Sequence, residues 1–125
     1  MLNGIRLLLV DDDELLRIAL AGFLELAGAH VLEAPDAEEA VSCLSAGPVD
    51  VLLTDLQLPG ESGIRLAEWV AAHLPALPVV LMSASLPPSG TVLPAPVRHF
   101  VRKPFDPDAL RDVLLQAHRG APPGP

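Results

Sequence analysis

The sequence has few aromatic residues, with three phenylalanines, one tryptophan and no tyrosine among its 125 residues. Half of the residues are nevertheless hydrophobic, so the core must consist mainly of leucine, valine and alanine. The single cysteine, Cys43, excludes an internal disulfide and is typical of a reducing compartment. No run approaches the roughly 20 apolar residues that a membrane span requires. These absences predict one soluble, cytoplasmic domain without membrane insertion.

Basic residues are also scarce: eight lysines and arginines against sixteen acids give a net charge of −8. Phosphate backbones attract basic surfaces, so direct binding of nucleic acid is not expected. Lysine occurs only once, at Lys103. A lone lysine is usually a solvated surface charge, and only its neighbours in the fold give it a function.

Apolar runs of strand length alternate along the chain with segments of helical period. The predicted strands are 5–10, 30–34, 49–54, 79–83 and 97–101. The predicted helices are 14–27, 36–47, 62–74 and 106–118, the last three beginning at capping residues. This alternation predicts an α/β fold in which a doubly wound, five-stranded parallel sheet is covered on both faces. We expect one domain over residues 1–119, followed by a flexible tail rich in proline and glycine over 120–125.

Polar side chains follow four of the predicted strands, at the sheet edge where ligands of such folds bind. In chain order they are Asp11, Asp12 and Asp13, then Asp55, then Ser83, then Lys103. Each has an ordinary explanation when taken alone, such as a helix cap, a turn residue or a surface charge. Their coincidence on one edge favours a functional site.

Neighbouring carboxylates on this edge need a positive partner. Two of them ~4 Å apart repel by about 4 kcal/mol at an effective dielectric constant of 20. Mg²⁺ prefers oxygen ligands and keeps several waters, so it fits such a site, and Lys103 adds a further positive charge. A metal ion, an ammonium and the Ser83 hydroxyl together are suited to stabilising a transferring phosphoryl group.

The ordered motifs LLVDDD, DLQLPGESG, Ser83-Ala84 and KPF at 103–105 resemble the receiver domains of two-component response regulators. The resemblance extends from Arg6 to about His118 and includes receivers of hybrid histidine kinases. It implies a flavodoxin-like strand order, 2-1-3-4-5. It also implies that Asp55 is the phosphoacceptor and attacks the phosphorus of a phosphohistidine on a histidine kinase or a histidine phosphotransfer protein.

The resemblance further implies the roles of the surrounding residues. Mg²⁺ would be bound by the side chains of Asp12 and Asp55 and by the backbone carbonyl of Gln57, with Asp11 in the second shell or acting through water. Asp13 lies outside this acidic pair and is predicted to cap the first helix.

Three residues of the fourth and fifth strands would respond to the phosphoryl group. Ser83 would move to hydrogen-bond one phosphoryl oxygen, and Lys103 would pair with another. Phe100 would turn inward when Ser83 moves, which would signal to a downstream effector of unknown identity. The Lys103–Pro104 bond is predicted to be cis. Such a protein is not an enzyme in the usual sense, because it catalyses only its own phosphorylation and dephosphorylation.

The chain departs from this family between the fourth and fifth strands. Residues 85–96 read SLPPSGTVLPAP, with four prolines and a glycine. Proline inside a helix removes a backbone donor and clashes with the preceding turn, at a cost of about 3 kcal/mol. We therefore predict that the fourth helix of the family is missing or reduced to one turn, leaving a mobile loop. Dimerisation through that helix is then not expected.

Two other functions remain as alternatives. A Mg²⁺-dependent phosphatase of the haloacid dehalogenase kind also uses an aspartate at a strand end, but it needs a second aspartate two residues later. Position 57 is Gln here, which cannot transfer a proton. A receiver-like scaffold that is never phosphorylated is the second alternative, although such proteins normally lose an acidic residue or the lysine.

Overall fold

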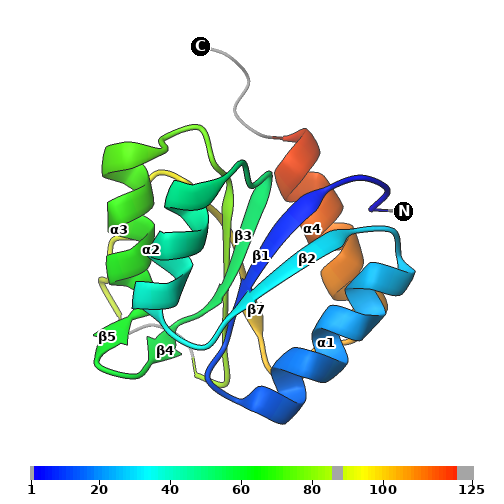
Figure 1. The fold of residues 1–125 in the computed structure, drawn as a ribbon. Coiled ribbons are helices and arrows are strands. Elements are labelled where there is room, and N and C mark those ends of the chain that lie inside the picture. The colour runs from blue at the N-terminus through cyan, green and yellow to red at the C-terminus, as the bar shows by residue number, and fades with distance from the viewer. Residues whose placement is uncertain (1, 86–88, 121–125) are drawn as a thin grey trace.

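The sheet forms the centre of the molecule in the computed structural model, which describes residues 2–85 and 89–120. Its five parallel strands have the order β2-β1-β3-β6-β7 (Figure 1). These strands are β1 (Arg6–Val10), β2 (His30–Ala34), β3 (Val51–Asp55), β6 (Val79–Ser83) and β7 (Val97–Arg102). Because β6 and β7 are the fourth and fifth sheet strands in chain order, the predicted order 2-1-3-4-5 is confirmed.

Helices cover both faces of the sheet (Figure 1). One face carries α1 (Glu14–Leu26) and α4 (Pro107–Arg119), and the other carries α2 (Ala37–Ala46) and α3 (Gly63–His73). Successive residues of β1 point alternately to these faces, so that Leu7 and Leu9 join the core layer of α1 and α4. Leu8 and Val10 join the layer of α2 and α3. Among the described residues, no helix has the length and apolar character needed to cross a membrane.

Capping side chains fix where the helices begin. Each accepts a hydrogen bond from a backbone N–H in the first turn of its helix: Asp13 from Leu16 (3.1 Å), Asp36 from Glu39 (2.8 Å), Ser62 from Ile64 (3.2 Å) and Asp106 from Asp108 (3.1 Å). All four caps are those that the sequence predicts. Asp13 and Ser62 are important for the site because they cap the helices that follow β1 and β3, the strands next to Asp11, Asp12 and Asp55.

One small element was not predicted. The sequence predicts no strand between residues 55 and 61, whereas β4 (Gln57–Leu58) and β5 (Glu61–Ser62) pair as a short antiparallel hairpin. Strands of two residues are too short to show a hydrophobic period. The sequence indicates only the turn between them, which contains Gly60, and this glycine has a positive φ of 73° in the structure. The hairpin fixes the path of the chain just after Asp55.

The segment between β6 and β7 contains no helix in its described residues, 84–85 and 89–96. The helix labelled α4 is the one predicted from Asp106, so the described residues between β6 and β7 contain no counterpart of the family's fourth helix, in agreement with the proline distribution. Residues 86–88 and 121–125 lie outside the described residues, and the expected mobility of the loop and flexibility of the tail stay predictions.

Gly63 allows α3 to begin directly against the end of β3. Its N–H donates to the Leu56 carbonyl at 2.6 Å, and a Cβ at this position would overlap the carbonyl oxygen of Asp55. A side chain here would therefore displace either the helix or the backbone that carries Asp55.

We predict that Gly63→Ala lowers the free energy of unfolding by about 2 kcal/mol, the usual cost of overpacking a closed site. Gly22→Ala is the control, because Gly22 lies in α1 with no neighbouring heavy atom within 4 Å of the added Cβ. It should stabilise the protein by about 0.5–1 kcal/mol. Urea unfolding measures both, and a neutral Gly63→Ala would contradict the close packing.

Arg6 and Asp50 join β1 to the chain just before β3, at the end of the sheet opposite Asp55. The Asp50 carboxylate accepts hydrogen bonds from the Arg6 guanidinium at 3.0 Å and from the Arg6 backbone N–H at 2.8 Å. The hydrogen bond from the guanidinium is the main reason why the pKa of Asp50 is lowered. Ionised Asp50 is therefore favoured more strongly in the folded than in the unfolded protein.

The lowered pKa predicts a pH-dependent effect of Asp50→Asn. The stabilisation by Asp50 is fully present above the ordinary aspartate pKa of 3.8 and is lost as the pH falls through the lower pKa of the folded state. We expect Asp50→Asn to be less stable than wild type at pH 7 and nearly as stable in strong acid. Thermal melts across this range test the prediction, and a constant difference would contradict it.

Candidate functional site

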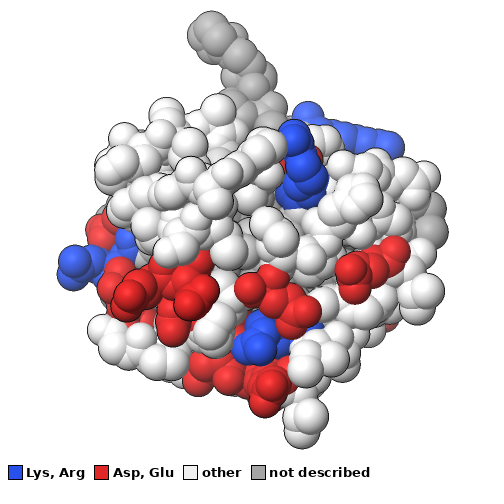
Figure 2. Space-filling view, viewed as in Figure 1, with Lys and Arg blue, Asp and Glu red and all other residues white. Residues whose placement is uncertain are grey.

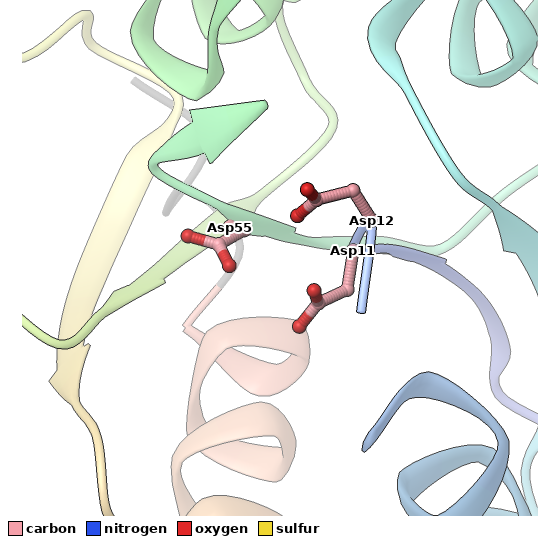
Figure 3. A group of neighbouring side chains, drawn as sticks. All are labelled: Asp11, Asp12 and Asp55. Atoms are coloured by element: carbon pink, nitrogen blue, oxygen red, sulfur yellow. The ribbon is translucent and has the colours of Figure 1, made fainter. Parts of the chain in front are cut away.

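Three carboxylates meet at the carboxyl end of the sheet (Figure 3). Asp11 and Asp12 directly follow β1, and Asp55 is the last residue of the neighbouring strand β3. One oxygen from each of the three lies within 4.8 Å of the others. In Figure 2 acidic side chains gather on the side of the molecule where α1 begins. The structure thus brings together the acids that the sequence predicts at this edge.

Burial and backbone hydrogen bonds hold two of the three carboxylates in place. Asp11 is 1% exposed and Asp55 is 8% exposed, whereas Asp12 is open to solvent. Asp11 accepts a hydrogen bond from the Asp13 N–H at 2.9 Å, and Asp55 accepts one from the Gln57 N–H at 3.1 Å. Asp11 and Asp55 are therefore fixed in orientation, while Asp12 faces the solvent at the mouth of the group.

Lys103 lies between the two buried carboxylates. Its Nζ donates to Oδ2 of Asp55 at 2.8 Å and to Oδ2 of Asp11 at 3.1 Å. Burial lowers the pKa of Lys103, but the hydrogen bonds to Asp55 and Asp11 and their negative charges outweigh it, and the pKa is raised. The side chain is therefore an ammonium ion at neutral pH, and it faces one oxygen of Asp55.

Ser83 ends β6, next to the strand that carries Asp55. It is 1% exposed, its carbonyl accepts the N–H of Lys103 at 2.8 Å, and its Oγ accepts the N–H of Ser85 at 3.2 Å. Phe100 lies further back on β7, opposite Leu81, and packs partly buried against the core layer of α2 and α3. Ser83 is thus adjacent to the site, and Phe100 lies behind it. The Lys103–Pro104 bond is cis, as predicted.

The donor set of this group fits a hard divalent cation. All three acids offer oxygen ligands, and three carboxylates with one ammonium leave a formal charge of −2 in a small volume. Both oxygens of Asp11 already accept hydrogen bonds, from Asp13 and Lys103. Both oxygens of Asp55 also accept hydrogen bonds, from Gln57 and Lys103, so Asp12 is the most open of the three ligands.

Sequence reasoning missed two supports of the site. The guanidinium of Arg17 donates to the Asp11 carbonyl at 2.8 Å and to Glu33 at 3.1 Å, which ties α1 to the ends of β1 and β2. Gly63 admits the close contact with Asp55. A glycine directly after a helix cap was a readable signal for a close approach, whereas nothing in the spacing of Arg17 indicates its partners.

Comparisons with known proteins agree with this geometry. Residues 7–115 match the family model described as the response regulator receiver domain. The chain is 34% identical over 115 residues to the C4-dicarboxylate transport transcriptional regulatory protein DctD of Rhizobium meliloti, covering 90% of this chain and 24% of that protein. It is 35% identical over 114 residues to a cyclic di-GMP phosphodiesterase of Thermotoga maritima, covering 90% and 30%. The chain therefore spans less than a third of these curated relatives.

Solved structures give the same result. A CheY-like receiver domain protein from Methanospirillum hungatei JF-1 has a TM-score of 0.89 at 23% identity, covering 95% of this chain and 97% of that one, which supports the fold. The response regulator TrrA of Thermotoga maritima, solved in complex with Mg²⁺-BeF, has a TM-score of 0.83 at 25% identity, covering 90% and 98%. The receiver domain of the hybrid histidine kinase CckA has a TM-score of 0.74 at 31% identity, also covering 90% and 98%. This chain belongs to the family of response regulator receiver domains.

Proposed function

We propose that this receiver takes a phosphoryl group onto Asp55 from a histidine kinase or a histidine phosphotransfer protein, in a Mg²⁺-dependent reaction in the cytoplasm. The observation that carries the proposal is the contact of 2.8 Å between Asp55 and Lys103, beside two further carboxylates. A buried carboxylate that already has an ammonium on one oxygen is prepared to receive a group rich in negative charge.

In the transfer, a carboxylate oxygen of Asp55 attacks the phosphorus. A new P–O bond forms, the P–N bond to the donor histidine breaks, and its electron pair returns to the imidazole. The ammonium of Lys103 donates to one oxygen of this carboxylate at 2.8 Å, which leaves the other oxygen to attack. Lys103 would pair with one phosphoryl oxygen and the Ser83 hydroxyl would donate to another, so charge is neutralised where it develops.

The metal would be held by residues at the carboxyl ends of β1 and β3. Asp12 and Asp55 would bind Mg²⁺ through their side chains and Gln57 through its backbone carbonyl, with Asp11 in the second shell or acting through water. When bound, the ion neutralises charge on the phosphoryl oxygens and orients them. The proposal is supported by the related response regulator TrrA, whose structure was solved in complex with Mg²⁺-BeF.

Phosphorylation would then change the positions of side chains on β6 and β7. Ser83 would move toward the phosphoryl group and Phe100 would turn inward, changing the surface that a downstream effector contacts. The chain would catalyse only its own phosphorylation and dephosphorylation. Gln57 argues against the phosphatase alternative, since it has no acidic proton, and the retained acids and lysine argue against a scaffold that is never phosphorylated.

We predict that Asp55→Asn abolishes incorporation of phosphate from acetyl phosphate in the presence of Mg²⁺. The amide is a far weaker nucleophile and cannot form the acid-stable, base-labile acyl phosphate. Asp50→Asn is the matched control, because the same change at the opposite end of the sheet should leave labelling intact. Intact-mass measurement follows the reaction, and an Asp55→Asn protein that labels like wild type would overturn the assignment. Turnover of an external phosphomonoester would instead favour a phosphatase.

We predict opposite effects for the two neighbours Asp12 and Asp13. Asp12→Ala relieves repulsion within the acidic group, so stability in metal-free buffer should stay unchanged or rise while phosphorylation is lost. Asp13→Ala removes the cap of α1 and should lower the free energy of unfolding by about 1 kcal/mol while phosphorylation persists. Urea unfolding in EDTA and labelling with acetyl phosphate separate the two. A clear loss of stability in Asp12→Ala would contradict a metal-binding role.

A further inference from the structure

A cavity of about 520 Å³, the amino-end cavity, lies at the end of the sheet opposite Asp55. It is bounded by the chain between α2 and β3, by the connection from α3 to β6 and by the end of α4 (Figure 1). Most of its wall is apolar and includes Leu44, Val49, Leu77 and Pro78. Binding sites for small molecules usually have volumes of roughly 300–1,000 Å³ and walls of this kind. The proposed phosphoryl transfer makes no use of this cavity.

The carboxylate of Asp50 lies in the wall of the amino-end cavity. Its Oδ2 accepts two hydrogen bonds from Arg6, whereas its Oδ1 accepts one, from the Arg6 guanidinium at 3.0 Å, among the contacts of the described residues. A carboxylate oxygen can accept two hydrogen bonds, so Oδ1 has room for another donor. Arg6 itself does not line the cavity, which therefore meets the negative partner of this ion pair and not the positive one.

His73 adds a second acceptor to the wall. Its Nδ1 lies 2.9 Å from the backbone carbonyl oxygen of Trp69, and a carbonyl can only accept, so Nδ1 carries the hydrogen. In the neutral ring the lone pair is then on Nε2. The imidazole also stacks on the indole of Trp69, with ring centroids 4.4 Å apart. Because Trp69 is the only tryptophan in the chain, its fluorescence can report on a ligand that contacts His73.

The carboxyl ends of three helices meet around the amino-end cavity. Gly47 directly follows α2, His73 ends α3, and His118 lies in the last turn of α4. The carboxyl end of a helix carries a partial charge of about −0.5. The last turn of α2 contains no basic residue, and that of α3 contains only His73. A positively charged group is therefore favoured in this cavity, and an anion is not.

We propose that the amino-end cavity binds a small molecule in which a protonated amine is attached to an apolar body. The ammonium group would donate to Oδ1 of Asp50 and to the imidazole of His73. The apolar body would pack on Leu44 and Leu77. A lysine side chain of a partner protein is a poorer occupant, because its narrow alkyl chain would leave much of this volume unfilled.

The test uses 2-phenylethylamine as the probe, with 2-phenylethanol and 3-phenylpropanoate as neutral and anionic compounds of similar shape. Isothermal titration calorimetry measures their binding to the full unphosphorylated chain in EDTA at pH 8, and the emission of Trp69 reports the place of binding. We expect the amine to bind with a Kd of about 1 mM or tighter and to change this emission. The alcohol should bind about tenfold more weakly, and the propanoate should not bind. Without metal or phosphoryl donor, the result is independent of phosphoryl transfer to Asp55.

Matched variants locate the binding site. Asp50→Asn keeps the shape of the side chain and removes its charge, so it should weaken binding of the amine by about tenfold and leave the alcohol unaffected. A merely structural defect would weaken both. Asp112→Asn is the same change on an exposed residue of α4 outside the cavity and should affect neither. Ala76→Phe fills the cavity and should abolish binding of both compounds, whereas Ala72→Phe, on an exposed position of α3, should not.

Several outcomes would overturn the proposal. They are no saturable binding of the amine at millimolar concentration, equal binding of the alcohol, and unchanged binding in Ala76→Phe. Equal losses in Asp50→Asn and Asp112→Asn would also contradict it, as would saturable binding that leaves the emission of Trp69 unchanged. Tighter binding of Nα-acetyl-lysine methylamide than of 2-phenylethylamine would show that the cavity holds a lysine of a partner protein instead. Circular dichroism on each variant confirms that the fold is retained.

Discussion

The ammonium group of Lys103 lies between the carboxylates of Asp11 and Asp55, and the arrangement of the whole carboxyl edge depends on it. Without this cation, two buried acids on adjacent strands would repel each other with Asp12 close by. The contact joins β7, at one edge of the sheet, to β1 and β3 at its centre. One side chain thus stabilises the edge electrostatically and reaches the residue that we propose as the acceptor.

The ammonium compensates this group only in part. Three carboxylates remain against one positive charge, and the most exposed of them, Asp12, has no described hydrogen-bond partner. A fully compensated group would be more stable, but it would offer no ligand to a cation and no nucleophile to phosphorus. The residual charge therefore links the stability of the fold to its proposed chemistry, since the same repulsion that costs free energy would favour binding of the proposed Mg²⁺ ion.

Much of this arrangement is predictable from sequence because it depends on order along the chain. Alternating periods define the strands, and parallel strands necessarily bring Asp11, Asp55, Ser83 and Lys103 to one edge. The absence of a helix from the described residues just before β7 can likewise be predicted from the prolines there. The partners of Arg17 and the orphan Nε of Arg98 are not readable, since they depend on how side chains pack across elements far apart in sequence. The β4–β5 hairpin is missed because its strands are shorter than any period.

Packing around Asp55 differs between its two sides, because Gly63 lies in close contact with the Asp55 backbone on one of them. On this side the start of α3 packs closely against the end of β3, and the Ser62 cap fixes the first turn of the helix, so the backbone here has little room to move. On the other side, β7 is only partly buried and has a shifted register, so its residues can move with less loss of packing. A displacement of Asp55 would therefore disturb much closer packing at α3 than at β7.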